Sequence, residues 1–303
     1  MQNQRPDLIP SIGLAFGAMM WGLYWIPIRG IEAAGVHAYW TGPVIFGASS
    51  LLFLPFILFR WRIFAQNWRR ILVPGILAGL AFSLYIASLN LTDVVRAILL
   101  FYISPVWSTA LGMLILKEKL TINRVAGLLL AFAGLYVVLA VDGKLPIPQN
   151  SGDWYALISG MCWSVASVKL FQDGATMILE KLTIFVFFAL LTSLMLIVWQ
   201  QGDLSGMPDL ASLIRGWYWI VIIAVSMLPI CYLTIWPTTL LSPGRAGMLL
   251  MGEVIVGVGS AAYLSGEVFG WRELVGTLLI VSAAIVEVAR QQTIQPVSPV
   301  ADL

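Results

Sequence analysis

The fold can be predicted from residues 96–127, whose sequence is RAILLFYISPVWSTALGMLILKEKLTINRVAG. A second stretch, RAGMLLMGEVIVGVGSAAYLSGEVFGWRELVG, residues 245–276, has the same length and the same layout. Aligned without a gap, the two share an Arg before an apolar run, a Glu in a charged corner and a Gly in the next run. Chance produces such matches less easily at boundaries than inside apolar sequence, so the alignment predicts that one unit has been duplicated. The shared boundary residues are Arg96 and Arg245, Glu118 and Glu267, and Gly127 and Gly276.

The composition is that of a membrane protein. Hydrophobic residues make up 60% of the 303 residues, charged residues 11%, and the mean hydropathy is +0.91. Soluble domains carry roughly a quarter charged residues, so a chain this apolar needs lipid as its main solvent. The cysteines, Cys162 and Cys231, lie in apolar runs and the single histidine is His37. We therefore expect no disulfide, no metal site and no cofactor.

Ten apolar segments are long enough to cross a bilayer, since about 20 residues span a hydrocarbon core roughly 30 Å thick. The first is longer than the apolar part of a signal peptide and carries Trp21, Tyr24 and Trp25, so we expect it to be retained. The connections are too short for a soluble domain, and residues 291–303 are predicted to form a disordered cytoplasmic tail. The predicted limits are 10–29, 37–59, 71–91, 95–116, 121–141, 153–171, 182–200, 216–238, 244–265 and 271–290.

The basic residues indicate the orientation. With the N-terminus in the cytoplasm, twelve of the 17 fall at cytoplasmic ends of the spans and five outside. The positive-inside rule then places both termini in the cytoplasm. Because each half has an odd number of spans, residues 1–145 and 146–290 run in opposite directions. The predicted fold is an all-α integral membrane protein of ten transmembrane helices in two inverted five-helix repeats, which is a transporter architecture with a site near the midplane.

Polar and aromatic residues in the middle of the spans are the candidate substrate-binding groups. Lipid contact is costly for polar groups at that depth, and interfacial belts place Trp and Tyr at span ends. Packing against a neighbouring helix is the alternative for each aromatic residue. As a set, we expect several of them to line one central cavity. The four residues expected there are Trp21, Tyr85, Tyr102 and Trp163. The predicted substrate-binding residues are Trp21, Tyr24, Tyr85, Asn90, Tyr102, Ser104, Trp107, Trp163, Lys169, Tyr232, Trp236 and Glu253.

Glu253, in MLLMGEVIVGVG, is the one ionisable residue that lies deep in a predicted span. A lone carboxylate is costly there and is a functional candidate by default. Three roles fit such an acid: it carries a proton, it binds a cationic group of the substrate, or it anchors a helix through hydrogen bonds. In the aligned first copy, Ser104 stands at this position.

The boundary motifs resemble those of the drug/metabolite transporter superfamily, in its ten-helix EamA-type branch. They are Lys117-Glu118-Lys119-Leu120-Thr121 before Gly127, and Gly266-Glu267 before Gly276. The family also tends to carry Leu-x-Glu-Pro-Val in the middle of its fourth and ninth helices. This chain divides that motif, because Ser104-Pro105-Val106 lacks the acid and Glu253-Val254-Ile255 lacks the proline. Glu253 therefore matches the family acid in one copy only.

Within that family the mid-span aromatic residues make the chain similar to the YddG-type aromatic amino acid exporters of bacteria. The similarity implies a multi-pass secondary transporter of the bacterial inner membrane that exports amino acids, aromatic and other apolar ones, or related metabolites by alternating access. The expected partners are the small-molecule substrate and membrane lipid. The sequence has no G-x-x-x-x-G-K-[ST] motif and no basic face for nucleic acid, so we expect neither an ATP-binding partner nor nucleic acid.

Other functions fit part of the same pattern. Glu253 beside aromatic residues suits efflux of organic cations, which are attracted to both. A membrane-embedded enzyme would need paired acids, a Ser/His or Cys/His set or a metal site, and the sequence shows none of these. We therefore expect no enzymatic activity. A passive channel or a scaffold is a further alternative.

Overall fold

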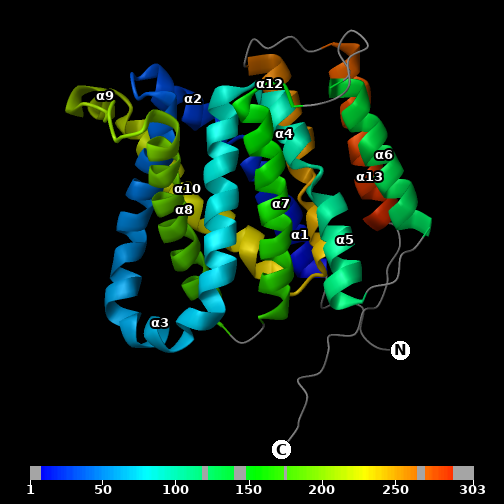
Figure 1. The fold of residues 1–303 in the computed structure, drawn as a ribbon, viewed down its shortest axis with the longest axis horizontal. Coiled ribbons are helices and arrows are strands. Elements are labelled where there is room, and N and C mark those ends of the chain that lie inside the picture. Colours follow the sequence, from blue (N-terminus) through cyan, green and yellow to red (C-terminus); the bar gives the residue numbers. More distant parts are fainter. Residues whose placement is uncertain (1–7, 118–121, 140–147, 174–175, 265–269, 289–303) are drawn as a thin grey trace, which may run out of the picture.

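The computed structural model describes residues 8–117, 122–139, 148–173, 176–264 and 270–288 (Figure 1). Within these ranges the regular structure is entirely helical. The charged corners at Glu118 and Glu267, and the predicted tail at residues 291–303, lie outside the described residues.

Six helical stretches in the described part of the chain are long and apolar enough to cross a bilayer. Three further long helices are α6 (Ile122–Leu139), α7 (Ser151–Gln172) and α13 (Trp271–Val288). A short helix, α9 (Leu210–Arg215), lies in the connection that we predicted between residues 200 and 216. The six apolar stretches are Leu8–Ala33, Ala38–Leu91, Val94–Leu116, Ile178–Gln201, Trp217–Thr238 and Pro243–Leu264.

Helix α3 (Ala38–Leu91) corrects the loop predicted at residues 60–70. The helix continues through this stretch and is kinked at Arg60, where φ is −119° and ψ is 18°. The predicted spans 37–59 and 71–91 are its two arms, and Figure 1 shows the chain reversing direction between them. The charges of RWRIFAQNWRR indicated a loop, but the stretch holds no Gly or Pro that would end a helix.

Three of the apolar stretches are broken helices. Residues 22–24 separate α1 (Leu8–Trp21) from α2 (Trp25–Ala33), so the first predicted span is not one continuous helix. Tyr102 and Ile103 separate α4 (Val94–Phe101) from α5 (Ser104–Leu116), and Leu250 and Met251 separate α11 (Pro243–Leu249) from α12 (Gly252–Leu264). In the alignment of residues 96–127 with 245–276, the last two breaks fall within one residue of each other.

The helices pack in a reciprocal pattern. Helix α1 packs against α10 (Trp217–Thr238) and α12, whereas α7 packs against α3, α4 and α5. Helix α8 (Ile178–Gln201) lies along α3. Helices α6 and α13 pack side by side at one edge of the molecule (Figure 1). The elements in the middle of this arrangement, α1, α3, α4, α7, α10 and α12, surround the pocket described below.

Small residues bring α3 and α8 into close contact. A Cβ added at Gly79 would lie 2.6 Å from the Ala189 nitrogen and 2.7 Å from the Phe188 carbonyl carbon, both of which are backbone atoms. One turn further on, the Ser83 hydroxyl donates to the Ala189 carbonyl oxygen at 2.7 Å. In a membrane, close backbone approach and hydrogen bonds between helices supply much of the packing energy. Gly79 therefore fixes the distance between these two helices.

An ion pair ties the start of α4 to the start of α7. Arg96 Nη2 lies 2.6 Å from Asp153 Oδ2, and the side chains are 15% and 0% exposed. The carboxylate also accepts hydrogen bonds from Thr92 Oγ1 at 2.8 Å and from the Gln149 backbone nitrogen at 2.9 Å. A buried charge with this many donors is well compensated, so the contact holds the two helix starts in one geometry.

Gly79→Ala is expected to destabilise the protein, because the new methyl group would press on the backbone of α8. Overpacking of this kind costs about 1–3 kcal/mol. The midpoint of thermal unfolding in detergent measures the effect. Gly259→Ala is the matched control, since a Cβ there meets no atom within 4 Å. Equal midpoints for the two variants would contradict the assigned contact between α3 and α8.

Candidate functional site

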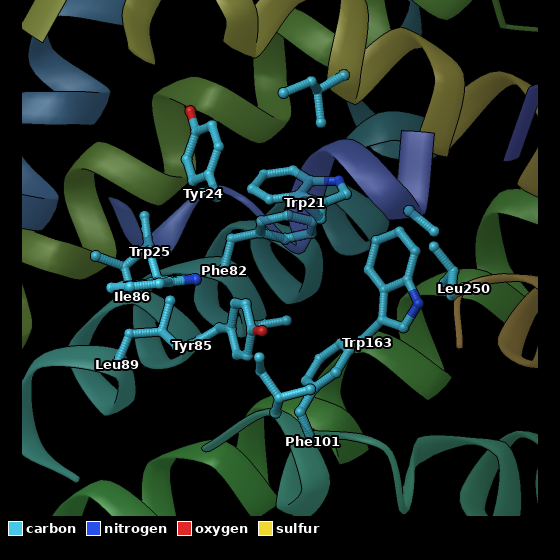
Figure 2. Close-up of a cluster of buried hydrophobic side chains, with 14 of the residues drawn as sticks. Trp21, Tyr24, Trp25, Phe82, Tyr85, Ile86, Leu89, Phe101, Trp163 and Leu250 are labelled. Atoms are coloured by element: carbon cyan, nitrogen blue, oxygen red, sulfur yellow. The ribbon is translucent and has the colours of Figure 1, made fainter. Parts of the chain in front are cut away.

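One buried pocket lies between α1, α3, α4, α7, α10 and α12. About 320 Å³ inside it, its opening included, is free of protein atoms. Figure 2 shows aromatic side chains that converge from α1, α3, α4 and α7. The lining residues are Trp21, Ala81, Phe82, Tyr85, Phe101, Tyr102, Ser159, Trp163, Thr234, Leu250 and Glu253.

Aromatic rings form most of the wall. Phe82 stands at the centre of one group, with its ring centroid 4.7 Å from that of Trp21 and 5.5 Å from that of Trp163. Tyr85 and Phe101 form a second contact, at 4.8 Å. Tilted and edge-to-face pairs at these distances are the arrangements that aromatic rings prefer. The wall is therefore fixed by ring packing, and it presents faces and edges of rings to the pocket.

Hydrogen bonds to neighbouring helices hold the polar atoms of the wall. Trp21 Nε1 donates to Thr234 Oγ1 at 2.9 Å, and that hydroxyl donates to the Ile230 carbonyl oxygen at 2.8 Å. Ser159 Oγ donates to the Ala81 carbonyl oxygen at 2.6 Å. Trp163 differs, because its indole Nε1 has no hydrogen-bond partner among the described residues. The indole N–H of Trp163 is therefore available to donate a hydrogen bond to a ligand.

Glu253 is the only charged side chain among the lining residues, and it is 3% exposed. The Tyr85 hydroxyl donates to Glu253 Oε1, and the Tyr102 hydroxyl lies 2.6 Å from Oε2. Glu253 also lies in the first turn of α12, where the helix dipole favours a negative charge. No Lys or Arg in the described part of the chain pairs with it. The site thus offers a carboxyl group held by two phenols, with no cation beside it.

The two helix breaks place Tyr102 and Glu253 together. At the break before α12, the Val254 nitrogen donates to the Met251 carbonyl oxygen, one residue short of the regular partner, Leu250. The Leu250 carbonyl oxygen instead accepts from the Glu253 nitrogen at 3.0 Å and lies 2.6 Å from the Tyr102 hydroxyl. Backbone groups released inside a membrane need such partners. Tyr102, itself at the break between α4 and α5, supplies one.

Five of the predicted substrate-binding residues line this pocket, namely Trp21, Tyr85, Tyr102, Trp163 and Glu253. Two others support it from outside. Tyr24 packs on Trp21, with ring centroids 4.6 Å apart, and its hydroxyl donates to the Ile223 carbonyl oxygen. Ser104 is buried at the start of α5, next to the break at Tyr102.

The remaining five predicted residues do not line this pocket; they are Asn90, Trp107, Lys169, Tyr232 and Trp236. Asn90 Nδ2 donates to the Ala38 carbonyl oxygen and so ties the two ends of α3 together. Lys169 is exposed. Tyr232, 42% exposed, stacks on Trp236 at 5.8 Å on the outer side of α10. Four-residue spacing identified a shared face correctly, but it does not say which way that face points.

Sequence reasoning missed Phe82, Phe101, Thr234 and Leu250. Phe82 precedes Tyr85 by three residues, so helical spacing places both on one face of α3. Asn90, a polar residue of the same helix, is among the predicted substrate-binding residues but does not line the pocket. Ser83, which is also polar, donates to the backbone of α8, so its polarity serves helix contact. Leu250 contributes through its backbone carbonyl, which no side-chain pattern reveals.

Comparison with known proteins agrees with this architecture. Residues 9–140 match the EamA-like transporter family. An uncharacterized transporter of Vibrio cholerae is 27% identical over 189 residues, which are 59% of this chain and 63% of that protein. The uncharacterized transporter YojE of Bacillus subtilis is 28% identical over 144 residues, 44% of this chain and 47% of YojE. The matches thus span less than two thirds of the length of these relatives.

A crystal structure that is 18% identical in sequence resembles this one with a TM-score of 0.62, over 91% of this chain and 95% of its own. At that identity the likeness concerns the fold alone. The family match covers the helices from α1 to α6 and so includes the aromatic residues that α1, α3 and α4 bring to the pocket. With its bilayer-length apolar helices, this chain is a multi-pass protein of the bacterial inner membrane, and its residues 9–140 match the EamA-like transporter family.

Proposed function

We propose that this chain is a secondary transporter that exports amino acids with aromatic or other apolar side chains, or related small metabolites, by alternating access. The observation that carries the proposal is the aromatic pocket with one carboxyl group at its polar end. An apolar side chain would pack on the rings of Phe82 and Trp163. The amino group would lie against Glu253, and the indole N–H of Trp163 would donate to the substrate carboxylate. Few polar groups in an apolar wall are typical of small-molecule sites.

Alternating access would be performed by two inverted five-helix halves, residues 1–145 and 146–290. The reciprocal packing supports this division. In the first half α1 packs against α10 and α12 of the second, and in the second half α7 packs against α3, α4 and α5 of the first. The helix breaks at Tyr102 and Leu250, which fall within one residue of each other in the alignment, support it as well. Halves related in this way exchange the two sides of a central site by rocking.

The aligned arginines support the same division. Arg96 of the first half reaches Asp153, in the first turn of α7. Arg245 of the second half reaches Ser11, in the first turn of α1, at 3.0 Å from Nη2 to Oγ. The first helices of the two halves can also be aligned, with GAMMWG (residues 17–22) on SGMCWS (residues 159–164) and Trp21 on Trp163. The same alignment places Ser11 on Asp153. Each arginine thus connects its own half to the start of the other.

The distribution of charge supports a cytoplasmic N-terminus. Helices α2 and α9 lie at one end of the molecule and the kink of α3 at the opposite end, where α1 starts (Figure 1). The kink carries Arg60 and Arg62, and the arm after it Arg69 and Arg70. A cluster of arginines between two spans faces the cytoplasm under the positive-inside rule.

Efflux of organic cations is the second candidate. It is favoured by the absence of any Lys or Arg among the pocket-lining residues, because the carboxylate of an amino acid would then depend on Trp163 alone. A cation of aromatic character needs only the ring faces and Glu253.

Transport by purified protein in liposomes distinguishes the two. We expect saturable uptake of phenylalanine, tyrosine or leucine with counterflow, and Glu253→Gln should reduce it about tenfold or more, since a hydrogen bond to a charged group contributes roughly 1.5–3 kcal/mol. Glu32→Gln, on the surface salt bridge with Arg29, is the control and should transport normally. Uptake of aromatic quaternary ammonium ions without amino acids would replace the first candidate with the second. Conductance without saturation would contradict both.

Alternating access also predicts which side chains water reaches. In a chain whose two cysteines are replaced by serine, Leu250→Cys should react with a charged, water-soluble thiol reagent, and bound substrate should slow the reaction. Ile255→Cys, on α12 just after the break at Leu250, is the control. Ile255 is 54% exposed on the protein surface, where lipid keeps a thiol from ionising, so it should react little. Faster labelling at residue 255 than at 250 would contradict the assignment of the pocket as the aqueous path.

A further inference from the structure

The polar end of the pocket contains three short contacts between oxygen atoms. Tyr85 Oη bonds to Glu253 Oε1, Tyr102 Oη lies 2.6 Å from Glu253 Oε2, and the same Tyr102 Oη lies 2.6 Å from the Leu250 carbonyl oxygen. Distances of this size between oxygens are those of O–H···O hydrogen bonds. Three linear hydrogen bonds at these positions need three hydrogen atoms, whereas a smaller number would leave one hydrogen shared between two acceptors.

The number of hydrogens available depends on the state of Glu253. Each tyrosine supplies one, and a carbonyl oxygen supplies none. If Glu253 is ionised, two hydrogens serve three contacts, and the one hydrogen of Tyr102 has both Oε2 and the Leu250 carbonyl oxygen as acceptors. If Glu253 carries a proton on Oε2, that proton bonds to Tyr102 Oη, and the Tyr102 hydrogen bonds to the Leu250 carbonyl oxygen. All three contacts are then satisfied.

We propose that Glu253 is a proton-binding site of the transport cycle and that Tyr102 couples its protonation to the junction between the two broken helices. This inference rests on the proposed transport function. With Glu253 protonated, Tyr102 donates to Leu250 and links the break between α4 and α5 to the break between α11 and α12. With Glu253 ionised, the Tyr102 hydroxyl turns to Oε2, and the link to the Leu250 carbonyl is lost.

No other charged group competes for this position among the described residues around the pocket. Helix α3 contributes Tyr85, the break between α4 and α5 contributes Tyr102, and α1 contributes the uncharged indole of Trp21. On the charged elements that pack against α12, Arg96 of α4 pairs with Asp153, and Arg272 and Glu273 lie in the first turn of α13. The remaining wall, from α7 and α10, is aromatic or hydroxylated. The proton and a cationic group of the substrate are therefore the two ligands that balance the charge of Glu253.

The two ligands exclude each other at the same oxygens. When the ammonium group of a substrate donates to the carboxylate, the proton on Oε2 leaves to water, and when the substrate leaves, a proton returns. The Tyr102 hydrogen moves between two acceptors and no covalent bond changes other than that of the exchanged proton. Binding of substrate from the cytoplasm and of protons from outside gives export coupled to proton entry, because each state of Glu253 favours a different state of the helix junction.

Infrared spectroscopy of the protein in lipid nanodiscs tests the proton site without any transport assay. At neutral pH the wild type should show the carbonyl stretch of a protonated carboxylic acid, and Glu253→Gln should remove it. Glu180→Gln is the matched control, because Glu180 is equally buried but lies 3.6 Å from Arg60 and has no tyrosine partner. It should leave the band unchanged. Identical carboxylic-acid bands in wild type and Glu253→Gln would overturn the proton site, even if transport is observed.

The role of Tyr102 is tested by comparing two tyrosines that contact the same carboxyl group. Tyr85 donates to Oε1 in both states of Glu253, whereas only Tyr102 changes its acceptor. The measured quantity is the ratio of uptake driven by a proton gradient to counterflow without a gradient. Tyr102→Phe should lower this ratio about tenfold, a coupling free energy of about 1.4 kcal/mol, while Tyr85→Phe changes it by less than about twofold. Tyr218→Phe, on the exposed surface, is the control.

An equal fall in the ratio of gradient-driven uptake to counterflow in Tyr102→Phe and Tyr85→Phe would overturn the coupling role of Tyr102. Removing the hydroxyl that changes its acceptor would then have no more effect than removing the one that does not. Failure of wild-type transport with every substrate would contradict the proposed function, and the infrared result would still decide whether Glu253 holds a proton.

Discussion

Backbone groups released inside the membrane must find a partner, and this requirement organises the centre of the protein. Regular helices satisfy their own carbonyls, but a helix that breaks at midspan does not. Here two breaks meet, and the Tyr102 hydroxyl of one reaches the Leu250 carbonyl oxygen of the other at 2.6 Å. The same hydroxyl contacts Glu253, so the polar end of the pocket is a product of the way in which the breaks are satisfied. The site and the fold thus share one hydrogen-bond network.

Much of the fold follows from apolar length alone. The limits predicted for the later spans lie within a few residues of α8, α10 and α13, because a hydrocarbon core requires about 20 apolar residues whatever their order. Breaks and kinks do not follow from length. The arginines around Arg60 suggested a loop, yet nothing in that stretch ends a helix, and the break at residues 22–24 falls inside an unbroken apolar run. The count of ten spans and the inverted repeat remain proposals.

The part of the candidate site that could be predicted is the part formed by polar and aromatic side chains. Trp21, Trp163 and Glu253 stood out because such groups are costly against lipid, and all three line the pocket. Tyr232 satisfied the same criterion, but it lies on the outer side of α10, since periodicity gives a face without its direction. Leu250 could not be predicted for a different reason. It contributes its backbone carbonyl oxygen to the network, and every residue has a backbone carbonyl, so the sequence does not distinguish this one.

The difference between Ser104 and Glu253 at aligned positions has an electrical consequence. With one carboxyl group in the pocket, the proposed cycle would exchange a single positive charge at Glu253. A monovalent organic cation exchanged for one proton moves no net charge, so the membrane potential would neither assist nor oppose it. A zwitterionic amino acid exchanged for one proton moves one net charge inward, which gains about 2.3 kcal/mol per 100 mV. A second acid at Ser104 would double that charge, so in the proposed cycle the difference between these two positions would set how strongly voltage acts on transport.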